Sequence, residues 1–172
     1  MTGKVVVITG GASGIGRATA LAFARQGTKV FIADIDLAGA KDVVASIKDQ
    51  GGEADCVQVD VSKSTEVQAM VTKAVDRYAG LDFAFNNAGL VGPAVGVVET
   101  SEEDWAHVVA TNLTGMWLCM KYEIPEMLKR GTGLVVNNGS VTGLVGAPGA
   151  VANVCSKHDV TGLTKSAALQ IR

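Results

Sequence analysis

The stretch that most constrains the fold is TGGASGIG, residues 9–16, which lies between an apolar β-branched run and a helical pattern. The preceding run, KVVVITGG, is typical of a strand buried on both faces of a parallel sheet. The following segment, GIGRATALAFARQG, spaces its apolar residues as a helix does and stops at Gly27. Glycines between a strand and a helix let backbone N–H groups approach a phosphate. We therefore expect a strand, a phosphate-binding turn and a helix.

The same alternation continues along the chain. Further strands are predicted in KVFIADI, ADCVQVDV, LDFAFNNAG and GLVVNNGS, with helices between them, the longest from about Ser101 to Lys129. The loop VTGLVGAPGA precedes a last helix, within which the sequence stops. No repeat or charged linker divides the pattern, so we expect one domain over residues 1–172. The alternation predicts an α/β fold, a three-layer Rossmann-type doubly wound parallel sheet, with ligands outside the carboxyl ends of its strands.

Charge and composition exclude several function classes. With 15 basic and 17 acidic residues, the chain lacks a broad cationic surface, so we expect neither nucleic acid nor a membrane as partner. No run approaches the ~18 apolar residues of a membrane span, and we expect a cytoplasmic location. Cys56, Cys119 and Cys155 have no CxxC spacing and form no cluster with His107 or His158. We therefore expect neither disulfides nor a metal site.

An acidic residue ends the second predicted strand. Asp34 closes VFIAD about 20 residues beyond the glycines, where a carboxylate can accept hydrogen bonds from an adenosine ribose. The same carboxylate would repel a 2′-phosphate. The sequence therefore favours NAD over NADP as the cofactor.

Several motifs together resemble the short-chain dehydrogenase/reductase family. They are TGGASGIG, the pair Asp60 and Val61, NNAG at 86–89, NLTG at 112–115, NNGS ending at Ser140, and SKH at 156–158. The resemblance covers essentially the whole chain, and six motifs in family order are more specific than any single one. It implies a nicotinamide-dependent oxidoreductase whose small-molecule substrate is an alcohol or a carbonyl compound.

The resemblance also assigns roles to individual residues. Asn112, Ser140 and Lys157 match the family's catalytic positions, and Asn86 matches a scaffold position of the central sheet. The implied cofactor-binding residues are Thr9, Gly10, Ser13, Gly14, Ile15, Gly16, Asp34, Asp60, Val61, Asn87, Ala88, Gly89 and Lys157.

One catalytic position departs from the family. The family places a tyrosine thirteen residues after the serine and four before the lysine, and here that position is Asn153. The tyrosine passes a proton as hydride moves, whereas an amide has no proton to give at accessible pH. We do not expect Tyr78, Tyr122, Cys155 or His158 to replace it; His158 follows Lys157 and should point about 100° away on a helix. Catalysis is therefore expected to be impaired.

The family also continues beyond the last predicted helix, so we expect a sheet that is incomplete on its C-terminal side. LVVNNG is then an exposed edge strand, and the last helix carries an apolar stripe of Val160, Leu163 and Ala167. A homo-oligomer is possible through this helix and the one from Ser101. Three hypotheses remain open: an impaired NAD-dependent oxidoreductase, a non-catalytic nucleotide-binding or interaction protein, and an inactive truncated fragment.

Overall fold

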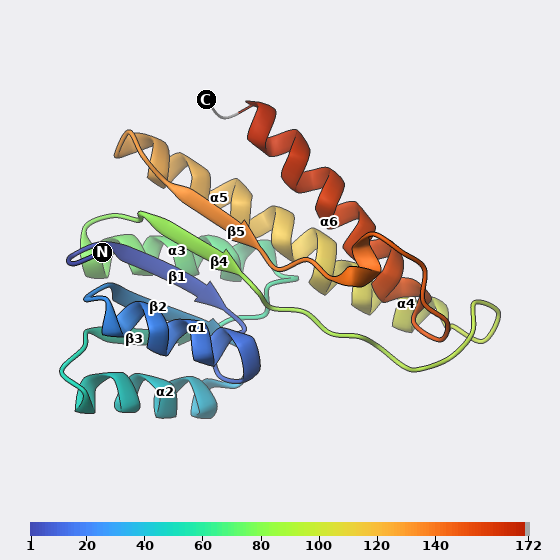
Figure 1. Ribbon diagram of the computed structural model, residues 1–172, viewed down its shortest axis with the longest axis horizontal. Helices are drawn as coiled ribbons and strands as arrows, with labels where there is room; N and C mark the ends of the chain where they lie inside the picture. The colour runs from blue at the N-terminus through green and yellow to red at the C-terminus, as the bar shows by residue number, and fades with distance from the viewer. Residues whose placement is uncertain (171–172) are drawn as a thin grey trace.

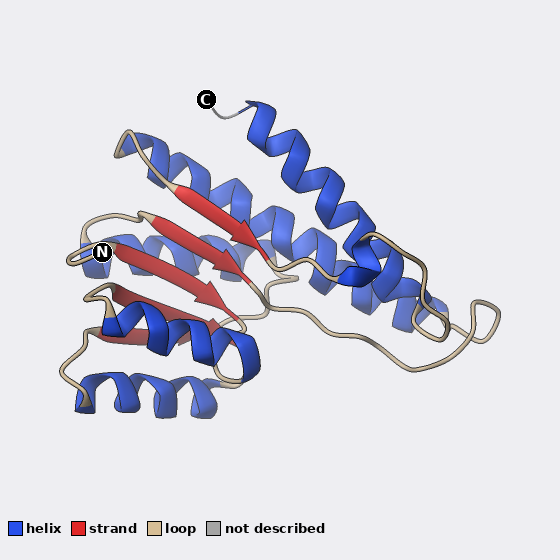
Figure 2. Ribbon diagram, viewed as in Figure 1, coloured by secondary structure: helices blue, strands red, loops and turns tan. Residues whose placement is uncertain are grey.

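A parallel sheet of five strands forms the centre of the molecule (Figures 1 and 2). The computed structural model describes residues 1–170. The strands stand in the order β3-β2-β1-β4-β5, each pair parallel, so the predicted doubly wound sheet is confirmed. Their bounds are β1 Val5–Thr9, β2 Lys29–Asp34, β3 Ala54–Gln58, β4 Phe83–Asn86 and β5 Leu134–Asn137. The fifth strand thus ends earlier than its sequence pattern suggested, because Ser140 already caps the short turn η2, Val141–Gly143.

Helices cover both faces of the sheet, as Figure 2 shows. On one face, α1 (Gly14–Arg25) and α2 (Leu37–Asp49) pack on the side chains of Val6 and Ile8. On the other, α3 (Ser64–Tyr78) and α5 (Gly115–Lys129) pack on Val5 and Val7. All five residues of β1 are buried because alternate side chains point into two separate cores. This burial explains why VVVIT reads as an unbroken apolar run.

The segment predicted as one helix from Ser101 to Lys129 needs a correction. It consists of α4 (Glu102–Val109), the π-helical turn η1 (Ala110–Thr114) and α5. Ser101 caps α4 by accepting a hydrogen bond from the backbone N–H of Asp104. The π turn contains Asn112. The Asn112 side chain hydrogen-bonds to the backbone of Leu90 in the loop after β4. π turns of this kind are frequent at functional sites.

The last helix, α6 (Val151–Gln170), packs against α4, η1 and η2 and extends past the edge strand β5 (Figure 1). Leu134 and Val136 of β5 are 57% and 47% exposed. The predicted exposed edge is therefore present. Among the described residues, no helix is long and apolar enough to cross a membrane.

Candidate nucleotide-binding site

A cleft of about 540 Å³ opens at the carboxyl ends of β1, β2 and β4. This is the edge at which ligands bind in open parallel sheets. Most of the predicted cofactor residues line it, although they come from distant parts of the sequence. They are Gly10, Ser13, Gly14, Ile15, Asp34, Asp60, Val61, Asn87, Ala88 and Gly89. Six further lining residues were not predicted from the sequence: Ala33, Ile35, Leu90, His107, Thr111 and Asn138.

The glycine turn is shaped by close backbone contacts. Gly14 begins α1 with φ +51°, and a Cβ at Gly16 would lie 2.0 Å from the carbonyl oxygen of Gly10. The side chain of Ser13, the residue before α1, makes no capping hydrogen bond to the helix, and the first turn of α1 has no acidic residue. The first N–H groups of α1 are therefore free to bind an anion. Gly16 itself does not line the cleft, but only glycine allows the turn to close.

Asp34 fixes the turn from the end of β2. Its Oδ2 accepts a hydrogen bond from the backbone N–H of Ala12 at 2.9 Å, and its Oδ1 accepts one from Asp36 at 3.0 Å. Asp36 in turn caps α2. The carboxylate is therefore held in place at the cleft while each oxygen keeps capacity for a further bond.

Asp60 occupies a similar place after β3. Its Oδ1 accepts hydrogen bonds from the hydroxyl and the backbone N–H of Ser62, at 2.7 and 2.9 Å. The hydroxyl bond is the main cause that holds the pKa of Asp60 below its usual value. Asp60 thus presents a fixed, ionised carboxylate to the wall of the cleft formed with Val61.

A chain of hydrogen bonds joins Lys157 to the glycine turn. Lys157 Nζ donates to the carbonyl of Asn138 at 2.6 Å, and Asn138 Nδ2 donates to Asn87 Oδ1 at 2.9 Å. Asn87 Nδ2 then donates to the carbonyl oxygens of Thr9 and Gly10. Thr9 lies behind the cleft, where its hydroxyl accepts from the N–H groups of Asn87 and Ala88. Lys157 is buried, and burial lowers its pKa.

Asn112 connects the cleft to α6. Its side chain is fully buried and clamps the backbone of Leu90 through two hydrogen bonds, of 2.8 and 2.9 Å. Its Nδ2 also donates to Asn153 Oδ1 at 3.3 Å and to Ser156 Oγ at 3.2 Å. Asn112 therefore positions the loop after β4 and the first turns of α6 together.

Ser140 lies outside the cleft lining and is exposed. Its Oγ accepts hydrogen bonds from the hydroxyl and the N–H of Thr142, at 2.9 and 3.1 Å. Thr142 Oγ1 also accepts from Asn153 Nδ2 at 3.3 Å. Thr142, which the sequence reasoning missed, is thus the bridge between the two positions. Its place two residues after Ser140 was the available signal.

Residues 4–172 match the model of the short chain dehydrogenase family. This chain belongs to that family. It is 42% identical over 167 residues to a cyclohexanol dehydrogenase of Acinetobacter sp. strain SE19, an alignment that covers 97% of this chain and 66% of the relative. The chain thus spans just under two thirds of that relative's length.

Two solved structures are also similar to this chain. One is a short-chain dehydrogenase/reductase from Burkholderia phymatum in complex with NAD, with TM-score 0.93, 36% identity and coverage of 96% of this chain and 59% of that one. The other is an actinorhodin polyketide ketoreductase with NADPH, with TM-score 0.94, 36% identity and coverage of 98% and 65%. The fold therefore occurs with either dinucleotide.

Tyr78, Tyr122 and His158 do not line the cleft. His158 is exposed, and its Nδ1 lies 2.9 Å from the carbonyl of Val154. The hydroxyl of Tyr122 lies 2.9 Å from the hydroxyl of Ser64 in α3, and Tyr78 is buried in the core. Burial raises the pKa of Tyr78 above its usual value. Within the part of the chain that the structure describes, no cluster of His, Cys, Asp and Glu could hold a metal ion.

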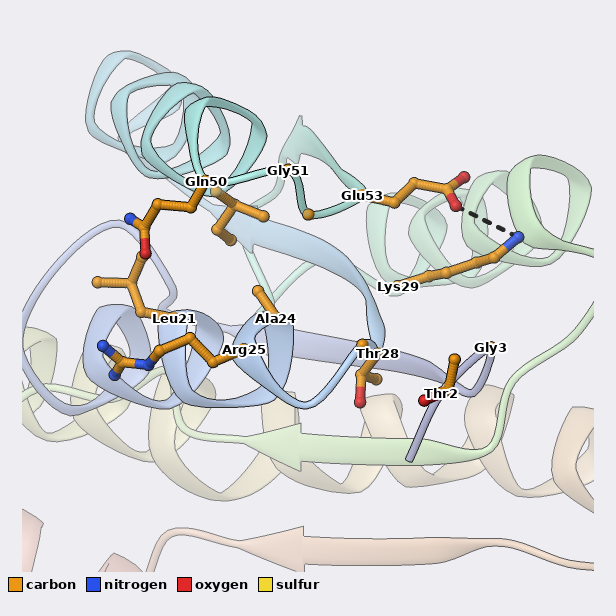
Figure 3. Close-up of a pocket in the computed structure, with 13 residues that line it drawn as sticks. Thr2, Gly3, Leu21, Ala24, Arg25, Thr28, Lys29, Gln50, Gly51 and Glu53 are labelled. Carbon is orange, nitrogen blue, oxygen red and sulfur yellow. Dashed lines mark ion pairs between the residues drawn. The ribbon is translucent and has the colours of Figure 1, made fainter.

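A second cavity, also of about 540 Å³, lies at the opposite edge of the sheet (Figure 3). It is formed where α1 and α2 end and β2 begins, with Lys29 and Glu53 paired at 3.4 Å beside it. None of the predicted cofactor residues reaches this cavity. The predicted cofactor residues that line a cleft are therefore gathered at the carboxyl edge of the sheet.

Proposed function

We propose that this chain binds NAD and is an impaired NAD-dependent oxidoreductase of the short-chain type, acting on an alcohol or carbonyl compound. The observation that carries the proposal is the carboxylate of Asp34, held against the glycine turn by Ala12 and Asp36 at the cleft. The free N–H groups of α1 suit a pyrophosphate, and Asp34 suits an unphosphorylated ribose. When bound, the nicotinamide would accept or supply the hydride.

Calorimetric titration with NAD and NADP tests the binding half of the proposal. We expect NAD to bind more tightly, because a 2′-phosphate beside Asp34 meets a like charge. Residues 35–40, which follow Asp34, contain no lysine or arginine that could offset this repulsion. Equal or tighter binding of NADP would refute the assignment.

The proposed impairment follows from Asn153. Its amide is built into hydrogen bonds with Asn112 and Thr142 and can neither give nor take a proton. Without a general acid and base, a rate falls by roughly 10² to 10⁴. We expect trace NADH formation at most with a panel of secondary alcohols. Substantial activity that Lys157→Ala leaves unchanged would show that the site lies elsewhere.

The same hydrogen bonds favour a second candidate, a non-catalytic nucleotide-binding or interaction protein. In that case Asn153 is a structural amide that joins α6 to η1 and η2. Tight NAD binding with no turnover, even after a tyrosine is restored at this position, would support it.

A further inference from the structure

A buried polar cluster lies behind the cleft, between the ends of β4 and β5 and helix α5. Nδ2 of Asn86 donates to Oε2 of Glu123 at 3.0 Å and to Oδ1 of Asn137 at 3.1 Å. Nδ2 of Asn137 continues the network to Oγ1 of Thr164 in α6 at 2.8 Å. Glu123 is 0% exposed and Asn86 is 1% exposed. The cluster thus contains a carboxyl group that bulk water does not reach.

Two oxygens of this cluster have no hydrogen-bond partner within residues 1–170: Oε1 of Glu123 and Oδ1 of Asn86. They belong to two groups that are already joined through their other atoms, Oε2 and Nδ2. Buried polar atoms without partners are rare because each has lost its bonds to water. A carboxylic acid offers one donor and one acceptor, which match the acceptor and donor of an amide. A single proton on Oε1 would satisfy both oxygens.

We propose that Glu123 is a protonated carboxylic acid that pairs with both polar atoms of the Asn86 amide and positions the ends of β4 and β5. Asn86 directly precedes Asn87, which holds the carbonyl of Gly10. Asn137 directly precedes Asn138, whose carbonyl holds Lys157. By fixing the Asn86 amide, which also bonds to Asn137, the Glu123 proton would hold the ends of β4 and β5 in place. The effect on cofactor binding rests on the proposed function, whereas the protonation does not.

The surroundings of Glu123 favour the neutral acid. Burial raises its pKa to about 7, although the hydrogen bond from Asn86 opposes this shift. Its titratable neighbour on α5 is Cys119, whose thiol pKa is raised by burial and then by the Glu123 charge. β4 and β5 contribute the amides Asn86 and Asn137, and α3 adds apolar side chains to the core around Cys119. From α6 come Thr164 and the ammonium of Lys157, which lies on the Asn138 carbonyl.

Glu123→Gln tests the pairing, because a glutamine amide keeps a donor group and an acceptor oxygen but has no proton to lose. A carboxyl with its folded pKa raised from 4.5 to about 7 stabilises fully below pH 4.5 and loses that contribution as pH rises to about 7. The difference in Tm, variant minus wild type, should therefore grow from pH 5 to pH 8. Glu126→Gln, on the same helix but paired with Lys129, is the matched control and should show no such trend. If Tm changes with pH in the same way in the wild type and in Glu123→Gln, the proposal is overturned.

The wild-type protein gives a direct readout. In a ¹³C-glutamate-labelled sample, one carboxyl signal absent from Glu123→Gln should have the shift of a protonated acid at pH 5.5 and titrate near pH 7. A carboxylate shift for that signal at pH 5.5 would mean an ionised Glu123, with the two oxygens bridged in another way, and would overturn the proposal.

The positioning role has its own measurement. NAD affinity of the wild type should weaken from pH 6 to pH 8 by at least about fivefold relative to Glu123→Gln, the lower end of ordinary coupling between sites. A constant ratio of the two affinities would refute the positioning role. If neither protein binds NAD, the proposed function is refuted. The protonation of Glu123 is then tested by its carboxyl NMR signal alone.

Discussion

Asn153 is the residue on which the proposed impairment depends. It lies one helical turn before Lys157 on the same face of α6, and both side chains are buried. Lys157 is held by the carbonyl of Asn138. Under the proposed function, the lysine that would adjust a phenol is present while the phenol is absent. Under the proposed function, the distinction between an enzyme and a binding protein rests on the Asn153 side chain.

Asn153→Tyr should restore a proton donor within reach of Lys157. We expect the rate of NADH formation to rise by roughly 10² to 10⁴ over the unmodified chain, the usual contribution of general acid and base catalysis. The measurement is NADH absorbance with secondary alcohols, after binding of NAD has been verified. Asn153→Phe supplies the ring without the hydroxyl and is the control. An equal rise in both variants would attribute the effect to packing.

Asp34→Asn should weaken NAD binding and reduce the preference over NADP. Removal of a charged acceptor costs about 1.5–3 kcal/mol, or roughly 10- to 150-fold in Kd. NADP should lose less, because the same change removes a like charge. Asp42→Asn alters the net charge equally on the exposed side of α2 and should leave both Kd values unchanged in calorimetry. If Asp34→Asn still prefers NAD over NADP to the same degree, another residue must discriminate between the two cofactors.

Among the elements, the glycine turn and α1 form one unit. Gly16→Ala places a Cβ 2.0 Å from the Gly10 carbonyl, so the turn must open, at a cost of about 1–3 kcal/mol. We expect a lower Tm and a loss of NAD affinity. Gly162→Ala is the matched control: this glycine lies inside α6 with open space around it, and alanine should stabilise the helix by up to about 1 kcal/mol. Unchanged NAD binding in Gly16→Ala would contradict the assigned turn.

Helices and strands could be predicted from the sequence where the residues that determine them are neighbours in the chain. The buried run of β1 and the glycine turn could be read from neighbouring residues, because burial on both faces imposes an unbroken apolar segment. The π turn at Ala110–Thr114 could not, since one extra residue of winding leaves the helical pattern intact on either side. Asn138 and Thr142 escaped notice because their partners on α6, Lys157 and Asn153, lie 19 and 11 residues away.

At the scale of the whole molecule, the sheet edge at β5 leaves apolar side chains uncovered, with Leu134 57% and Val136 47% exposed. A groove of about 590 Å³ separates α5, β5 and the second half of α6, lined largely by apolar side chains. Of the stripe expected on α6, Val160 is buried, whereas Leu163 and Ala167 are only half-buried. An uncovered edge with apolar flanks favours pairing with another chain.

We expect this chain to associate with other chains through the β5 edge. Val136→Lys introduces a charge on the outward face of β5, where the native side chain is 47% exposed, and should not disturb the core. We expect the fraction of dimers and larger species at micromolar concentration to fall in sedimentation velocity, because a lysine on an edge strand opposes pairing. Val98→Lys changes a residue that is 87% exposed in the loop after β4 and serves as the control. A monomeric wild-type chain, or an equal decrease in both variants, would show that β5 is not the contact surface.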